Sequence, residues 1–453
     1  MHPRSVRHTS AAARGQSALR KSTHRPAVGR REASEFARTE SEVRYYCRAM
    51  PAVFTRAVNA RLWAEDGAEY IDFLSACGAQ NFGHNHPFIK GRVAAYLAGD
   101  GVLNALDLHT SAKADFLHAF RTGILEPRGL SYRLQFPGPT GTNAVEAALK
   151  LARKATGRRA VVSFTNAFHG MTLGALAVSG NRRGAAADDV IRLPFDGSAG
   201  AGIEELQRFE AMANDPSGGL SLPAAFLVET VQGEGGLNVA GIHWLRELAA
   251  LAKRLGALLI VDDIQAGCGR TGSYFSFERA GIAPDIICLA KSISGIGLPM
   301  ALVLISPDHD RWAPGEHNGT FRGNNLAFVG AAAALEAWQS PSFQAGMQEK
   351  GERLRAWAED MTARYSPFVS EVRGLGWMLG LGFDRPDAAR LVAGEAVASG
   401  VLIETAGPKS EVLKLFPPLT IEPELLEEGL CRIEAAIRRV CEASAPLPRC
   451  ATA

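Results

Sequence analysis

Strand-length runs of apolar residues alternate with amphipathic helix patterns through the middle of the chain, and this alternation limits the fold most narrowly. Apolar residues recur at helical spacing in Asn143–Thr156 and His243–Leu255. Strands joined through such crossover helices form a mostly parallel sheet that is covered on both faces. The sequence therefore predicts an α/β fold. The predicted buried strands are Val161–Phe164, Ala224–Val228, Ala257–Val261, Ile286–Ala290 and Ala301–Ile305.

A different pattern follows Trp338. Long helices and short strands are predicted there, at Phe343–Tyr365, Trp377–Phe383, Pro386–Ser399, Val401–Glu404 and Pro423–Cys441. The segment 40–87 carries two more strand patterns, Ala52–Ala57 and Tyr70–Phe73, and we expect it to pair with this C-terminal part. Since 453 residues exceed a typical single domain, we expect a large sheet domain and a smaller α+β domain. The large domain is placed at 91–338, the small one at 33–90 and 339–442, and a tail at 443–453.

Composition narrows the class of protein. Hydrophobic residues make up 47% of the chain, which is ordinary for a globular protein and too many for a disordered one. No stretch reaches 18 uncharged apolar residues, so the sequence predicts no membrane-spanning helix. The seven cysteines are scattered without a C-x-x-C pair, which favours a reducing cytoplasm.

The charge is unevenly distributed. The first 31 residues carry 8 Lys and Arg and no acidic residue, which leaves 41 basic residues against 47 acidic ones in the rest. A mildly acidic body argues against a nucleic-acid partner. We expect 1–32 to be a disordered basic tail or the product of a start placed too far upstream, with an organellar transit peptide as the alternative.

Polar side chains follow three of the predicted strands at the point where each strand ends. In open parallel sheets, ligands bind beyond the carboxyl ends of the strands, so we expect these side chains to converge. Solvated strand ends are the alternative for any one of them. The residues are Glu229 and Glu234 after one strand, Asp262, Asp263 and Gln265 after the next, and Lys291 after a third.

Lys291 and a turn at 138–143 suggest a particular ligand. A lysine that enters a pocket from a buried strand is desolvated, which lowers its pKa and frees its amine for Schiff-base chemistry. The turn Gly-Pro-Thr-Gly-Thr-Asn opens a helix and offers free N–H groups to a single phosphate, unless Thr142 or Asn143 is simply an N-cap. One ligand that offers an aldehyde to Lys291, a pyridinium nitrogen to Asp262 and a phosphate to the turn is pyridoxal phosphate.

Two further motifs are interpreted as structural. The run 267–272 matches G-x-G-x-x-G, but no helix pattern follows it and no acid lies about 20 residues on, so a dinucleotide site is not expected. His84 and His86 have no third metal ligand at a recognisable spacing, and a turn is expected there. We expect no metal site.

From about Glu40 to Arg438 the chain resembles the class III pyridoxal-phosphate aminotransferases. The resemblance implies fold type I, and a homodimer or a higher even oligomer with active sites at the interface. The matching stretches are Asp66–Asp72, Gly83–Pro87, Ala144–Arg153, Phe168–Gly170, Val228–Glu234, Ile260–Gln265 and Pro284–Lys291.

The resemblance also implies roles for individual residues. Lys291 is the Schiff-base lysine, and Asp262 pairs with the ring nitrogen. Gln265 contacts the ring hydroxyl, and Phe168 stacks on the ring. Gly141 and Thr142 bind the phosphate, together with Thr320 of the second subunit.

Four stretches resemble a branch of the family that uses L-glutamate and 2-oxoglutarate with an amino aldehyde acceptor. They are Gln135–Asn143, Phe168–Gly174, Lys291–Gly295 and Glu316–Asn325.

The chain departs from the family where substrate carboxylates are held. Met171 and Lys414 stand where many members have arginine, and Asn143 stands where a glutamate is usual. Lysine lacks the guanidinium fork that grips a carboxylate. We therefore expect Arg322 to bind one carboxylate and Lys414 to bind the other when Glu234 releases it.

Overall fold

The computed structural model describes residues 35–180, 189–385 and 387–444. The expected tail at 1–32 lies outside these residues, as do positions 445–453 of the expected C-terminal tail. Within the described ranges, no helix is long and apolar enough to cross a membrane.

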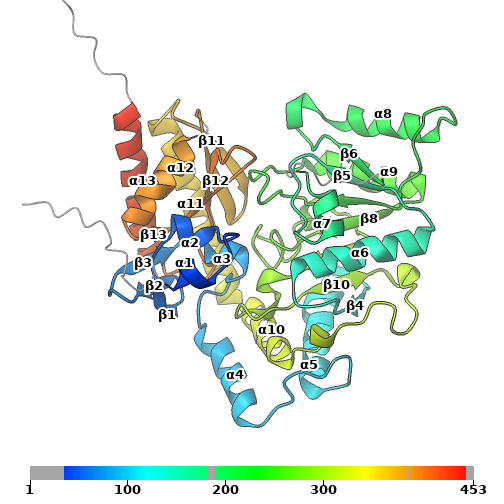
Figure 1. The fold of residues 1–453 in the computed structure, drawn as a ribbon, viewed down its shortest axis with the longest axis horizontal. Helices are drawn as coiled ribbons and strands as arrows, with labels where there is room; N and C mark the ends of the chain where they lie inside the picture. The colour runs from blue at the N-terminus through cyan, green and yellow to red at the C-terminus, as the bar shows by residue number, and fades with distance from the viewer. Residues whose placement is uncertain (1–34, 181–188, 386, 445–453) are drawn as a thin grey trace, which may run out of the picture.

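The larger part of the molecule is built on a seven-stranded sheet (Figure 1). Neighbouring strands from β9 to β6 run parallel, and β10 runs antiparallel to both of its neighbours. This mostly parallel sheet confirms the predicted α/β fold. In spatial order the strands are β4 (Arg133–Gln135), β10 (Leu302–Ile305), β9 (Ile286–Leu289), β8 (Leu258–Asp262), β7 (Ala225–Val228), β5 (Val161–Phe164) and β6 (Val190–Leu193).

The reversed direction of β10 agrees with a connection that contains no α-helix. Between β9 and β10 the chain forms only the 3₁₀ helix η5 (Lys291–Ser294). Parallel neighbours are usually joined by a crossover that contains an α-helix. The chain therefore turns back along β9, and Lys291 lies at the carboxyl end of that strand.

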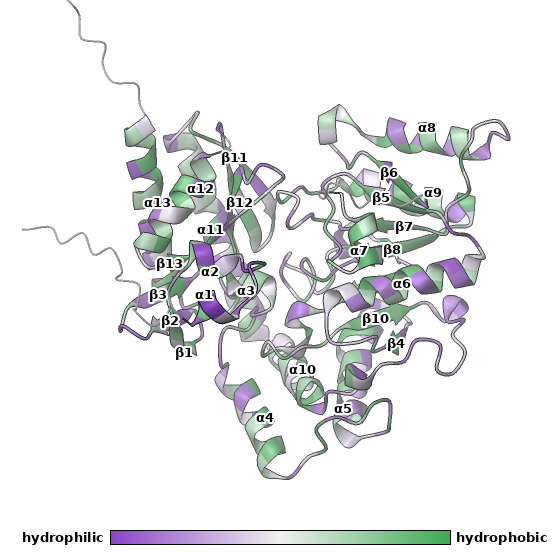
Figure 2. Cartoon of the chain, viewed as in Figure 1, coloured by the Kyte–Doolittle hydropathy of each residue, from purple (hydrophilic) through white to green (hydrophobic). Residues whose placement is uncertain are grey.

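Helices cover both faces of this sheet, which explains its continuously apolar strands. In β8, Leu258 and Ile260 belong to the core that includes α6 (Gly141–Thr156). Leu259 and Val261 belong to the core that includes α9 (Ile242–Leu255). Because both sides of the strand are buried, apolar residues occupy every position, as the green strands of Figure 2 illustrate.

The smaller part combines segments from the two halves of the chain, as expected. β3 pairs in parallel with β13, with Ile71 opposite Val401. In Figure 1 the blue N-terminal elements lie beside the orange and red C-terminal ones. One sheet has the order β1 (Phe54–Val58), β2 (Arg61–Ala64), β3 (Glu69–Asp72), β13 (Val401–Leu402); the other has β11 (Val369–Leu375), β12 (Met378–Phe383), β15 (Val412–Leu415), β14 (Glu404–Ala406).

The remaining helices pack around these sheets. α11 (Pro341–Arg364), α12 (Ala388–Ala398) and α13 (Pro423–Ser444) belong to the smaller part. α10 (Asn325–Trp338) packs on α4 (Pro87–Ala98) and α5 (Ser111–Phe120). The others are α1 (Phe36–Thr39), α2 (Tyr46–Ala49), α3 (Ser75–Gly78), α7 (Leu173–Val178) and α8 (Ile203–Asn214).

Candidate active site

The carboxyl ends of β7, β8 and β9 face a cavity of about 310 Å³. The cavity gathers nine of the residues that the sequence analysis singled out, because the parallel strands that carry or precede them end at the same edge of the sheet. Those nine are Gly141, Thr142, Phe168, Met171, Glu229, Glu234, Asp262, Gln265 and Lys291, and the wall also includes Thr140, His169, Gly170 and Ile264.

Lys291 follows β9 directly and is the first residue of η5. Its φ of 53° lies in the left-handed region, which side-chain-bearing residues seldom adopt except where the surrounding structure imposes it. Burial lowers the pKa of Lys291, and the negative charge of Glu234 opposes that shift. Protein surrounds the Lys291 amine on every side except that of the cavity. This burial favours the neutral, nucleophilic form of the amine.

Asp262 is the last residue of β8 and is only 4% exposed. Its Oδ2 lies 2.7 Å from Nδ1 of His169, and its Oδ1 accepts a hydrogen bond of 3.1 Å from the Ile264 N–H. These contacts fix the carboxylate at the cavity wall. The sequence analysis gave His169 no role, although the residue stands next to Phe168 in a matching stretch.

Glu229 anchors the segment that carries Phe168. Its Oε2 accepts a hydrogen bond of 2.9 Å from the Phe168 N–H, and its Oε1 accepts one of 3.3 Å from the Gly233 N–H. Burial raises the pKa of Glu229 to about 7, although His169 and these backbone donors oppose the shift. The carboxyl group ties two loops together beside the cavity.

The N-terminus of α6 borders the cavity with free donors. Thr140, rather than Thr142 or Asn143, is the N-cap residue, and Oδ1 of Asn143 accepts a hydrogen bond of 3.2 Å from the Thr140 N–H. The backbone N–H groups of Gly141 and Thr142 have no hydrogen-bond partner in the described chain. Unpaired N–H groups at a helix N-terminus form an anion site.

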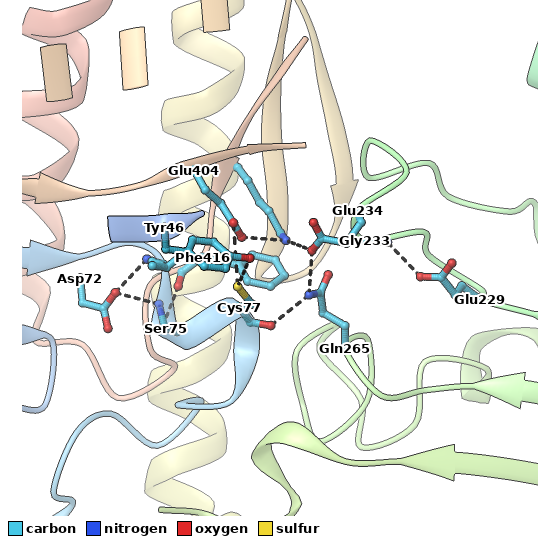
Figure 3. A network of polar contacts seen from close by, with 12 residues as sticks. Tyr46, Asp72, Ser75, Cys77, Glu229, Gly233, Glu234, Gln265, Glu404 and Phe416 are labelled. Atoms are coloured by element: carbon cyan, nitrogen blue, oxygen red, sulfur yellow. Dashed lines mark hydrogen bonds and ion pairs between the residues drawn. The ribbon is translucent and has the colours of Figure 1, made fainter. Parts of the chain in front are cut away.

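Lys414 lies behind Glu234, on β15. Its side chain is fully buried, and Nζ lies 2.9 Å from Oε1 of Glu234 and 3.0 Å from Oε1 of Glu404. Figure 3 shows both carboxylates turned toward one point between the two parts of the molecule. Gln265 Nε2 donates to Glu234 Oε1 over 3.3 Å and to the carbonyl of Cys77 over 2.9 Å. The sequence analysis anticipated Glu234 as a partner of Lys414 but missed Glu404.

Thr320 and Arg322 do not line this cavity within one chain. Arg322 Nη1 donates hydrogen bonds of 3.0 Å to the His317 carbonyl and to Asn318 Oδ1, and its Nη2 lies 3.8 Å from an Asp107 carboxylate oxygen. That Thr320 and Arg322 act in the active site of a second subunit stays a prediction.

The two motifs interpreted as structural form local structure. The run 267–272 consists of turns and a bend, and only the three-residue 3₁₀ helix η4 (Glu278–Ala280) follows it, so it lacks the context of a dinucleotide site. His84 Nε2 lies 3.1 Å from Asp72 Oδ2. Among the described residues, no group of three or more His, Cys, Asp or Glu side chains could hold a metal ion.

The fold and this cavity are those of an aminotransferase, and the chain belongs to the class III aminotransferases, whose family model matches residues 45–437. It is similar to diaminobutyrate–2-oxoglutarate transaminases of Halalkalibacterium halodurans (50% identical, covering 90% of this chain and 96% of the relative) and of Vibrio cholerae (52% identical, covering 89% and 99%). It also resembles a solved ornithine aminotransferase from Toxoplasma gondii with PLP at partial occupancy in its active site (TM-score 0.77, 26% identical, covering 90% of this chain and 94% of that one).

Pyridoxal phosphate, the cofactor of the family, matches the chemistry of this cavity. The free N–H groups at the start of α6 suit its phosphate, and the buried Asp262 suits its ring nitrogen. Oε1 of Gln265 is buried without a partner in the described chain, and buried polar atoms are normally hydrogen-bonded. The donor set fits the cofactor, with Lys291 as the amine.

Proposed function

We propose that this enzyme transfers the amino group of L-glutamate to L-aspartate 4-semialdehyde, giving 2-oxoglutarate and L-2,4-diaminobutyrate. One observation carries the choice of substrates: the relatives with that activity in their names are 50% to 52% identical over about nine tenths of the chain. The four stretches that match this branch of the family support it, since three of them include residues of the cavity wall.

Lys291 and Asp262 carry the proposed chemistry. Bound PLP supplies an aldehyde that condenses with amino groups and a ring that accepts electrons. Lys291 Nζ holds the cofactor at rest and, once released, moves the proton at the substrate carbon that bears the amino group. The Asp262 carboxylate keeps a proton on the ring nitrogen and so stabilises the charge that develops. His169 holds Asp262 in place for this task.

Other residues position the cofactor in this proposal. The N–H groups of Gly141 and Thr142 bind the phosphate, Phe168 covers the ring, and Gln265 contacts the ring hydroxyl. Thr320 contacts the phosphate from a second subunit, so the proposed active form is a homodimer or a higher even oligomer.

An exposed apolar ledge beside Thr320 supports the proposed dimer. The residues 102–108 run beside 320–325, held by hydrogen bonds from the Ala105 N–H to the Gly323 carbonyl (3.1 Å) and from the Asn325 N–H to the Leu103 carbonyl (2.9 Å). Large apolar side chains that are more than two fifths exposed gather here, and such patches commonly mark interfaces. They are Val102, Leu103, Leu106, Leu108 and Phe321.

The two carboxylates of glutamate need cations or several donors, because burying an unpaired carboxylate is costly. Met171 supplies no charge. In our proposal Arg322 of the second subunit binds one carboxylate, and Lys414 binds the other after Glu234 moves away.

We expect Arg322→Lys to raise the KM for glutamate and for 2-oxoglutarate about tenfold or more with little loss of PLP. The positive charge is kept, but the planar fork that binds a carboxylate bidentately is lost. Steady-state kinetics and the PLP content of the purified dimer measure the two effects. An unchanged KM for glutamate in a dimeric variant would place the carboxylate elsewhere.

A panel of amino donors and acceptors tests the choice of substrate. Diaminobutyrate and aspartate semialdehyde should be preferred over ornithine, lysine and 4-aminobutyrate and their aldehydes, which are the alternatives within the family. A difference of one methylene is worth only about 1–3 kcal/mol in a pocket, so values of kcat/KM are needed. A preference for ornithine or 4-aminobutyrate by orders of magnitude would refute the substrate and leave the class intact.

The cellular role is a further part of the proposal. The resemblance of the same stretches to ectoine-type enzymes supports a cytoplasmic role in ectoine synthesis, and diaminobutyrate supply for a siderophore or a peptide antibiotic is the alternative. Deleting the gene and measuring ectoine under salt stress separates the two.

A further inference from the structure

Lys414 has two carboxylate partners, and they are held in different ways. Glu404 and Lys414 face each other in register on the neighbouring antiparallel strands β14 and β15, and directly opposed side chains lie on the same face of a sheet. Glu234 instead comes from the connection between β7 and α9. The sheet therefore fixes Glu404 beside Lys414, whereas the contact with Glu234 depends on a loop.

The two carboxylates also differ in their access to the cavity. The Glu234 side chain is 27% exposed and lies in the cavity wall, whereas the Glu404 side chain is 8% exposed and lies behind it. A substrate carboxylate that enters from the cavity meets Glu234 first. Glu404 is positioned to stay with Lys414 when Glu234 is displaced.

Displacing Glu234 would be costly if Lys414 had no other anion. A buried ammonium without a partner is strongly destabilised. Within the described chain, Lys414 also lies near two uncharged groups. They are the Phe416 ring, whose centroid is 4.6 Å from Nζ, and the Cys77 thiol, whose pKa burial raises to about 11. Glu404 is therefore the anion that remains.

The charges around this group agree with two carboxylates sharing one cation. Burial raises the pKa of Glu404 in spite of Lys414. For Glu234, burial also acts to raise the pKa, but Lys414 and Lys291 outweigh it and hold the pKa at about 2. Lys414 and Lys291 thus keep Glu234 ionised.

We propose that Glu404 is a positioning residue that keeps Lys414 paired behind the cavity wall while Glu234 moves away, and so allows the site to accept a dicarboxylate. This inference rests on the proposed function, in which glutamate is the donor. Only the half-reaction with glutamate and 2-oxoglutarate needs Lys414 uncovered. The half-reaction with the amino aldehyde proceeds with Glu234 in place.

The test compares Glu404→Ala and Glu404→Gln with the wild-type holoenzyme. In both variants Lys414 still pairs with Glu234 when no substrate is bound, so both proteins should fold. We expect Glu404→Ala to raise the KM for glutamate and 2-oxoglutarate about tenfold or more, because Glu234 then leaves Lys414 less often. The KM for diaminobutyrate should change less than about twofold. Glu404→Gln keeps an oxygen acceptor for Nζ and should lie between Glu404→Ala and the wild type.

A second readout does not depend on turnover. Glutarate, a five-carbon dicarboxylate with no amino group to transfer, is titrated into each protein by calorimetry. Its Kd should rise about as much as the KM for glutamate. Glu411→Gln is the matched control, since Glu411 contacts Arg373 at 3.8 Å next to the same sheet and should leave both values unchanged.

The outcomes separate this inference from the proposed function. Unchanged glutarate binding and unchanged KM for glutamate in Glu404→Ala would overturn the inference, as would an equal rise in the KM of all substrates, which a general structural defect produces. A wild-type enzyme that does not react with glutamate would refute the proposed function, while the glutarate titration would still test Glu404.

Discussion

Replacing Lys291 by alanine should reduce steady-state transamination by at least about 10³-fold, which is within the range that a positioned general acid–base group contributes. The variant lacks the amine that holds the cofactor and the group that moves the proton. No other lysine lines the cavity in the described chain. The rate of 2-oxoglutarate release from glutamate, with saturating acceptor, measures the loss.

The control for this variant is the integrity of the fold. Lys291 lies in a left-handed backbone conformation that alanine adopts no more readily than lysine, so the melting temperature of the apoprotein should stay close to that of the wild type. A well-folded Lys291→Ala enzyme with wild-type turnover would show that the catalytic amine lies elsewhere.

Asp262→Asn should lower kcat by about 10²–10³-fold, the size of effect seen when one preorganised electrostatic group is removed. Asparagine keeps the shape of the side chain and can still bond to His169, but it carries no charge to hold a proton on the ring nitrogen. The effect should fall on kcat more than on the KM for glutamate, since Asp262 is not expected to touch the substrate carboxylates.

A matched substitution elsewhere tests whether this loss is specific. Asp189 pairs with Arg153 at 2.9 Å and does not line the cavity. Asp189→Asn should therefore keep kcat near the wild-type value. An Asp262→Asn enzyme as active as Asp189→Asn would contradict the role given to Asp262.

Much of the central sheet could be predicted because each strand is short, apolar and buried on both faces. β5 spans the predicted residues. β7, β9 and β10 differ from the predictions by one residue at one end, and β8 differs by one residue at each end. The convergence of Lys291, Asp262 and the start of α6 followed from one rule, that ligands bind beyond the carboxyl ends of parallel strands.

The missed residues lack such a local signal. Glu404 ends the predicted short strand Val401–Glu404, which lies outside the central sheet, and its role depends on the register that sets it opposite Lys414. His169 gains its importance from Asp262, which lies 93 residues away in the sequence. Register and long-range pairing depend on tertiary packing, which the pattern of a single sequence does not encode locally.

The central claim is that amino groups pass from glutamate to an aldehyde, and a nitrogen tracer tests it most directly. Holoenzyme is incubated with glutamate labelled with heavy nitrogen and with aspartate semialdehyde, and the products are followed by mass spectrometry. We predict that 2-oxoglutarate and diaminobutyrate accumulate in equal amounts, with the label on the side-chain nitrogen of diaminobutyrate. Labelled glutamate that is only racemised or rearranged, with no 2-oxoglutarate released, would contradict the account.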